Sequence, residues 1–239
     1  MRVSDKAILL QTIKHGDKKY ILKLYTLNNG FITAFAIVGY SSKSKIKSSA
    51  LFPLNLLDVE LVIKQNNEVH QLNEVSCYYV TTTISNSLSK LSIAQFINEI
   101  LIKTLKEQSS NPHLFSFIET CLKFLNTNET NFTNLHLYFL IELTKYLGIE
   151  PQNNFDKQHC FFDCREGQFT SHNLSFPLGL TEEESFLLSE FLKINSLKVN
   201  ITNSQRQRLL NIIITYYSIH IPNFGNIKSL EVLQEIITT

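Results

Sequence analysis

The spacing of apolar residues changes once along this chain, near residue 86, and this change limits the fold more than any other feature. Up to about residue 80, apolar residues alternate with polar ones, as in strands with one buried face. From residue 88 they recur every three or four positions, as in amphipathic helices. Strands followed by helices are typical of an α+β fold or of two domains. We therefore predict an α+β chain with domains at residues 1–82 and 83–239.

Five strand-like segments fill the first domain. They are rich in β-branched and aromatic residues and lie at residues 6–16, 18–27, 31–39, 54–64 and 68–80. A tight turn is predicted at Asn28-Asn29-Gly30, because Asn and Gly tolerate positive φ. Five short antiparallel strands fit a small closed or partly open barrel, an architecture that often binds oligonucleotides.

The second domain carries the helical pattern. Helices are predicted at residues 88–108, 109–126, 130–148, 181–194, 204–221 and 227–239. Asn111 followed by Pro112 predicts a helix start, and Gly148 predicts a helix end. Thr181 and Glu184 have the spacing of a capping box. We expect an all-helical domain with one interruption.

That interruption is a predicted hairpin insertion at about residues 155–175, with its turn at Glu166-Gly167. The metal-binding residue types in it are His159, Cys160, Cys164 and His172. Two thiols and two imidazoles could complete a tetrahedral zinc site. However, Cys160 and Cys164 are four positions apart, and the chain has no Cys-x-x-Cys pair. We expect buried thiols, no zinc and no other cofactor.

Charge is distributed unevenly, although the net charge is only +1. Residues 1–50 contain nine Lys and Arg against two Asp, whereas the remainder contains thirteen Lys and Arg against nineteen acids. This division predicts a basic face on the first domain and a mildly acidic second domain.

The basic residues are concentrated in the serine-rich stretch 39–52, where Lys43, Lys45 and Lys47 alternate. Such a run is usually a solvated loop. Alternatively, it is a site for a polyanion, supported by Lys14, Lys18, Lys19 and Lys23. If the run is extended, its lysines point the same way. Aromatic residues that could stack on bases are Tyr20, Tyr25, Phe31, Phe35 and Tyr40, although strand alternation buries about half of such residues.

Motifs of several enzyme classes are missing from the sequence. It contains no phosphate-binding Gly-x-x-x-x-Gly-Lys, no Gly-x-Gly-x-x-Gly and no His-Glu-x-x-His. His136, on an apolar helix, is more typical of a core residue than of a base. A nuclease would need clustered carboxylates to hold metal ions, and Asp58 and Glu60 are the candidates on the predicted barrel. We expect no enzymatic activity.

The first residues lack the pattern of a signal peptide, and no apolar stretch approaches the ~18 residues of a membrane span. From these features we expect a cytoplasmic protein without a membrane partner.

The order of several segments resembles the bacterial RecO family of DNA repair proteins, which are recombination mediators. The matching segments are KAILLQTIKHGDKKYILKLYTLNNGFITAFAIVGYSSKSK, ALFPLNLLDVELVIK, LNEVSCYY, LHLYFLIELTKYLGIEPQ and LLNIIITYYSIHIPNFGNIKSLEVL. Together they cover nearly the whole chain. None is a catalytic motif, and the specificity lies in their order and in the C-terminal segment.

The resemblance implies an N-terminal OB-fold and a C-terminal helical domain. It also implies binding to single- and double-stranded DNA, annealing of complementary strands, and help in loading the RecA recombinase together with RecR. A further implied partner is the C-terminal tail of the single-stranded-DNA-binding protein. The implied DNA binding would associate the protein with the nucleoid. Many family members carry a four-cysteine zinc site in the hairpin region, whereas this chain has only Cys160 and Cys164 there.

These implications lead to two candidate sites. The DNA site would consist of Lys14, Lys18, Lys19, Lys23, Tyr40, Lys43, Lys45 and Lys47. The site for the partner's tail would need an apolar pocket with a basic rim. Arg206, Arg208 and Lys228 are the predicted rim, with Leu209, Ile213, Tyr216 or Tyr217 nearby. Most of these apolar residues are more typical of a helix core than of a pocket. The alternatives to a DNA-binding mediator are a protein-binding scaffold without DNA contact and a metal-dependent nuclease.

Overall fold

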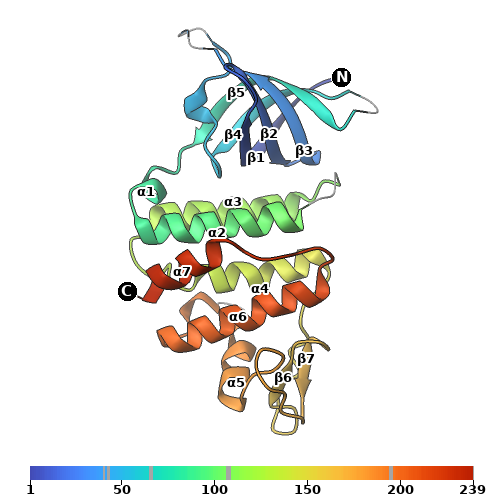
Figure 1. Ribbon diagram of the computed structural model, residues 1–239, viewed down its shortest axis with the longest axis vertical. Coiled ribbons are helices and arrows are strands. Elements are labelled where there is room, and N and C mark those ends of the chain that lie inside the picture. The colour runs from blue at the N-terminus through green and yellow to red at the C-terminus, as the bar shows by residue number, and fades with distance from the viewer. Residues whose placement is uncertain (40, 42–43, 65–66, 106–108, 194–195, 239) are drawn as a thin grey trace. The chain divides into compact units, whose positions relative to one another are not determined.

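The computed structural model describes residues 1–39, 41, 44–64, 67–105, 109–193 and 196–238 (Figure 1). It divides into two compact units. The barrel unit comprises Met1–Ser87 and Asn98–Asn126, and the helical unit comprises Leu88–Ile97 and Thr127–Thr239. The predicted boundary between residues 82 and 83 stays a prediction. No helix within the described ranges is long and apolar enough to cross a membrane.

Five strands form a closed barrel in the order β1-β2-β3-β5-β4 (Figure 1). They are β1 (Arg2–Lys14), β2 (Lys19–Thr26), β3 (Gly30–Ile37), β4 (Leu56–Val62) and β5 (Val69–Tyr79). The long strand β1 pairs with both β2 and β4, and this double pairing closes the sheet. Only β3 and β5 are parallel among the paired strands. The predicted five-stranded barrel of OB type is therefore confirmed.

Alternating side chains of the strands fill the barrel interior. On β2, Leu22 and Leu24 are fully buried, and on β3, Ala34 and Ala36 are fully buried. A register shift between Leu9 and Gln11 marks an irregularity in the pairing of β1 with β2. Bulges of this kind bend a strand, and a bend allows β1 to pair with both β2 and β4. The residues between these inward positions therefore form the outer surface of the barrel.

Helices cover part of that outer surface. The first three are α1 (Thr82–Ser85), α2 (Leu88–Thr104) and α3 (Pro112–Thr127). As predicted, Asn111 precedes α3, and its side chain accepts a hydrogen bond from the Leu114 amide at 3.0 Å. Tyr78 of β5 donates to the Glu119 carboxylate of α3 at 2.9 Å. The hydrogen bond between Tyr78 and Glu119 links α3 to the barrel.

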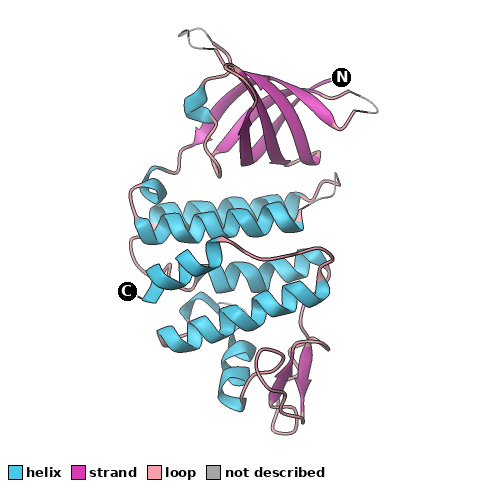
Figure 2. Ribbon diagram, viewed as in Figure 1, coloured by secondary structure: helices cyan, strands magenta, loops and turns pink. Residues whose placement is uncertain are grey.

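The helical unit contains four further helices, shown in cyan in Figure 2. They are α4 (Leu135–Leu147), α5 (Glu182–Phe191), α6 (Asn203–His220) and α7 (Ser229–Thr238). The predicted capping box of Thr181 and Glu184 starts α5. Gly148 ends α4 with φ 70°, a left-handed conformation that favours glycine. The predicted hairpin is also present, as β6 (Phe161–Asp163) paired with β7 (Gln168–Thr170).

Candidate nucleic-acid interface

One outer face of the barrel, on β1, β2, β3 and β5, is apolar and partly uncovered. Ile21 of β2 lies opposite Phe35 of β3, and both are half-buried. At the margins, Ile13, Ile37 and Val69 keep 41%, 58% and 42% of their surface exposed. An apolar patch left open on a barrel of this type is a candidate binding surface.

A hollow of about 390 Å³ opens beside this face. Phe35, Ile37 and Gln71 line it, with the lysines Lys18 and Lys45 among its other walls. The loop after β3 completes the hollow because its backbone is tied back to the sheet. Gly39 donates to the carbonyl of Ile46 at 3.1 Å, and Val75 donates to the carbonyl of Lys45 at 3.1 Å. The buried side chain of Ile46 anchors the same segment.

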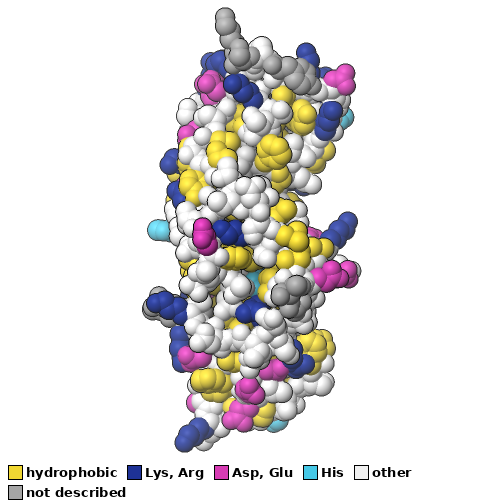
Figure 3. Space-filling view, turned by 90° about the vertical axis from the view of Figure 1, so that its left-hand side faces the viewer, with side chains coloured by type: hydrophobic (Ala, Val, Ile, Leu, Met, Phe, Trp, Pro, Cys, Tyr) yellow, Lys and Arg dark blue, Asp and Glu magenta, His cyan; other side chains and the backbone are white. Residues whose placement is uncertain are grey.

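The predicted basic residues lie at two places on the barrel. Lys14, Lys18 and Lys19 are exposed around the turn between β1 and β2, and Lys23 is half-buried on the outer side of β2. Lys45 and Lys47 are exposed in the loop after β3. Lys43 and Tyr40 lie outside the described residues. On the face drawn in Figure 3, Lys and Arg side chains stand apart among apolar ones and do not join into one band.

Lys45 has an acidic partner that is distant in the sequence. Its ammonium lies 2.8 Å from the Glu74 carboxylate of β5, with the two side chains 69% and 51% exposed. This hydrogen bond, with the charge of Glu74, raises the pKa of Lys45. The sequence could not reveal the pair, because the partners are 29 positions apart. Lys45 lies outside the strands and Lys43 lies outside the described residues, so a row of three lysines stays a prediction.

Alternation decides which of the predicted aromatic side chains remain accessible. Tyr25 is 2% exposed and stacks on Phe115 of α3, with the ring centroids 6.3 Å apart. Tyr20 packs against the interior of the barrel. Phe31 and Phe35 are half-buried on the outer side, and Phe35 lines the hollow. Phe35 is therefore the predicted aromatic best placed to meet a ligand there.

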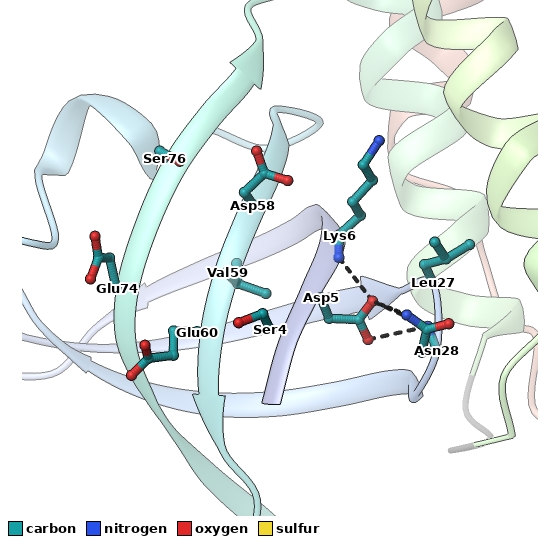
Figure 4. A pocket seen from close by; sticks show the side chains of 10 residues that line it. All are labelled: Ser4, Asp5, Lys6, Leu27, Asn28, Asp58, Val59, Glu60, Glu74 and Ser76. Atoms are coloured by element: carbon teal, nitrogen blue, oxygen red, sulfur yellow. Dashed lines mark hydrogen bonds between the residues drawn. The ribbon is translucent and has the colours of Figure 1, made fainter. Parts of the chain in front are cut away.

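The outer face of β4 and β5 is acidic instead (Figure 4). Asp58, Glu60 and Glu74 line a hollow of about 580 Å³, and Glu60 lies directly opposite Glu74 across the two strands. Asp5, at the same hollow, is occupied by hydrogen bonds from Asn28 and Asn29. Throughout the described residues, no three His, Cys, Asp or Glu side chains are grouped to hold a metal ion. Asp58 and Glu60, the candidates for a nuclease site, therefore belong to no such group among the described residues.

The four candidate zinc ligands of the hairpin do not converge either. Cys164 is fully buried, with its thiol 3.6 Å from the carbonyl oxygen of Ile212, and burial raises the pKa of this thiol to about 12. His159 turns its ring toward Asp156 at 3.0 Å. A zinc ligand must be a thiolate or a free imidazole nitrogen. Because Cys164 is enclosed in the core and no three His, Cys, Asp or Glu side chains are grouped among the described residues, the hairpin does not fit the metal.

The three basic residues predicted to form the rim for a partner's tail differ in exposure and in their contacts. Arg206 is 8% exposed and donates to Asn134 at 3.0 Å. Arg208 forms an ion pair with Glu184 and lies 4.5 Å from the centre of the Phe176 ring. Lys228 is exposed.

The apolar residues predicted beside that rim belong to the core, the alternative that an apolar helix favours. Leu209, Ile213, Tyr216 and Tyr217 are all 5% exposed or less. The tyrosine hydroxyls are used internally, because they donate to backbone carbonyls of Ile149 and Leu140. A different apolar set meets Arg206 at a small hollow between α4, α6 and α7, namely Leu210, Leu233 and Ile237, together with His136.

A closed OB-type barrel with lysines around one open face, followed by a separate helical unit, defines the chain as an OB-barrel protein of two units. The family model for the N-terminal part of recombination protein O matches residues 1–81, and that for its C-terminal part matches residues 85–231. The chain belongs to this family. It is 36% identical to the DNA repair protein RecO of Flavobacterium psychrophilum and 34% identical to that of Flavobacterium johnsoniae, over the full length of each. It is 29% identical to the DNA repair protein RecO of Phocaeicola vulgatus over 97% of each chain.

Proposed function

We propose that this chain is a non-enzymatic DNA-binding mediator, which uses the lysines at the open face of the barrel to hold DNA. The observation that supports it most is the hollow over Phe35, with Lys18 and Lys45 on its walls. The sequence between residues 18 and 57 also supports DNA binding, because it contains six lysines and no Asp or Glu. A basic surface with an apolar floor suits a strand that offers both phosphates and bases.

Binding of this kind would be largely independent of sequence, because lysines neutralise phosphates and release counterions. Annealing follows from the same charge. Lysines that screen the repulsion between two complementary strands lower the cost of bringing them together, while contacts to phosphate leave base edges free to pair. We propose that single- and double-stranded DNA are both bound and that, with RecR, the chain helps to load RecA onto single strands.

The test replaces Lys18, Lys45 and Lys47 together by alanine. Affinity for a labelled oligonucleotide is measured by fluorescence anisotropy over a range of salt concentrations. We expect weaker binding and a salt slope that is shallower by about 0.7–0.9 for each phosphate that is no longer neutralised.

The matched control is a triple alanine variant at Lys157, Lys193 and Lys198, exposed lysines of the helical unit. It removes the same charge at residues to which we assign no DNA contact. Equal effects of the two variants would reduce the proposal to a general charge effect. Absence of any salt-sensitive binding by the unmodified chain would favour a protein-binding scaffold.

A second proposed function is docking of the acidic tail of the single-stranded-DNA-binding protein on the helical unit. Its support is that Arg206 meets Leu210 and Leu233 at one hollow, since an acidic tail with an apolar end needs these two features together. The hollow is only about 10 Å³ and both leucines are buried, so docking here requires the hollow to open. Arg208 is less suitable, because Glu184 already pairs with it. Calorimetry with such a peptide should show binding that Arg206→Gln weakens, with circular dichroism to confirm that the variant is folded.

A further inference from the structure

Phe52 is an exposed aromatic residue that the predicted DNA site does not include. Its side chain is 63% exposed, whereas its neighbours Leu51 and Leu54 are 6% and 4% exposed. It is the most exposed phenylalanine among the described residues. Single exposed apolar side chains are common on protein surfaces. Phe52 differs from such cases in the way its backbone is held.

The turn that carries Phe52 is fixed to β1 on both sides. Thr12 donates from its hydroxyl to the carbonyl of Leu51 at 3.0 Å, and the Leu54 amide donates to the carbonyl of Leu9 at 2.6 Å. Inside the turn, Asn55 donates from its backbone to the carbonyl of Phe52 at 3.2 Å.

Two backbone features restrict the same turn further. Leu54 has φ 65°, a conformation that is uncommon for a bulky residue and persists only where its surroundings enforce it. Pro53 limits the backbone of Phe52 to extended conformations. The ring of Phe52 is therefore presented from a rigid stem, so little backbone freedom would be lost when a ligand packs on it.

Two lysines lie near this turn, one along the chain and one along β1. Lys47 immediately precedes the short 3-10 turn Ser48–Ala50 that leads to Phe52, and its carbonyl accepts from Ala50 at 3.1 Å. On the other side, Thr12, which binds Leu51, is two positions before the exposed Lys14. Lysines beside an exposed aromatic ring are the combination that binds single-stranded nucleic acid, through phosphates and through stacked bases.

We propose that Phe52 is a stacking residue for a base of single-stranded DNA, with Lys14 and Lys47 as the neighbouring phosphate contacts. The inference rests on the proposed DNA binding and adds to it a contact that only unpaired bases can make. A duplex keeps its bases stacked inside, so Phe52 contributes to binding of single strands and not of duplexes.

The test compares the full chain with Phe52→Ala by fluorescence anisotropy on three labelled ligands of equal length: oligo(dT), the same strand without bases, and a duplex. We expect the variant to bind oligo(dT) at least about fivefold more weakly, the loss from one stacked base. Affinity for the abasic strand and the duplex should stay unchanged. Phe52→Trp should restore binding, whereas Phe52→Leu should not.

The control is Phe186→Ala, which removes another exposed phenylalanine, 48% exposed, from α5. It should leave all three affinities unchanged. If Phe52→Ala leaves binding of oligo(dT) unaltered, or weakens binding to all three ligands equally, the stacking role is refuted while DNA binding by the lysines stands. If the unmodified chain binds none of the ligands, the proposed function itself fails.

Discussion

His136 provides a test of how burial of a polar side chain changes the stability of the helical unit. Its side chain is fully buried in α4, beside the ring of Phe96, with the two ring centroids 6.4 Å apart. Neither ring nitrogen has a hydrogen-bond partner of acceptable geometry among the described residues. Burial first, and then the charge of Arg206, lower the pKa of His136 to about 3, while the nearby backbone of Thr133 offsets part of the shift. We predict that His136→Leu stabilises the chain.

The stabilisation expected from His136→Leu depends on pH. The folded chain keeps His136 neutral down to about pH 3, whereas the unfolded chain protonates this side chain below its ordinary pKa of about 6.5. The stability of the folded chain is therefore fully retained above pH 6.5 and falls as the pH drops toward 3. At pH 5, keeping His136 neutral lowers the free energy of unfolding by about 2 kcal/mol. Burial of this unpaired polar side chain lowers it by a further ~1 kcal/mol at any pH. His136→Leu should thus gain about 1 kcal/mol near pH 7 and about 3 kcal/mol near pH 5.

The assay is urea unfolding followed by far-UV circular dichroism at both pH values. His113, exposed near the start of α3, provides the matched control, since His113→Leu removes an imidazole that is not buried. The free energy of unfolding of this control should change with pH as it does in the unmodified chain. A His136→Leu variant that is less stable, or whose gain is the same at both pH values, would refute the reasoning.

Three further predictions follow from individual contacts. Glu74→Gln should increase DNA affinity a few-fold in anisotropy titrations, because it frees Lys45 for phosphate. Glu60→Gln, which removes the charge directly opposite Glu74, should increase DNA affinity less. In a Lys45→Ala background, Glu74→Gln should no longer change DNA affinity. Gly179→Ala should lower the free energy of unfolding by about 1–3 kcal/mol, because an added Cβ would lie 2.6 Å from the carbonyl oxygen of Leu174. A midpoint of thermal unfolding equal to that of the unmodified chain would count against it. The purified chain should contain no zinc by atomic emission, and stoichiometric zinc would contradict our account of the hairpin.

The barrel and the helices could be predicted because their signals are local. The alternation that buries Leu22 and Leu24 lies within one strand, and the capping of α5 by Thr181 and Glu184 involves residues three positions apart. The hairpin turn at Gly167, with φ 67°, is local as well. In each case the residues that determine the structure are neighbours in the sequence, so one segment contains all the information needed.

The candidate sites were harder to predict because they depend on contacts between distant segments. Glu74 reaches Lys45 only through the closure of the barrel, which brings the loop after β3 onto β5. Helical periodicity did not show that Leu209 and Tyr217 face the core while Leu210 also borders a hollow, since α6 is apolar on most of its circumference. The exposure of Phe52 likewise depends on hydrogen bonds to β1, more than forty positions earlier for Leu54 and Leu9.

The barrel surface has two chemically opposite faces that meet at Lys45. On one side, Phe35 and Ile37 form an apolar floor near Lys18, and on the other, Glu60 and Glu74 stand opposite each other. Like charges directly across a strand pair are destabilising, so this arrangement costs stability, and Lys45 relieves part of the repulsion by binding Glu74. A DNA strand that followed the lysines would be repelled from the carboxylates, because both are negative. The carboxylates would thereby confine the strand to the face that offers an apolar floor.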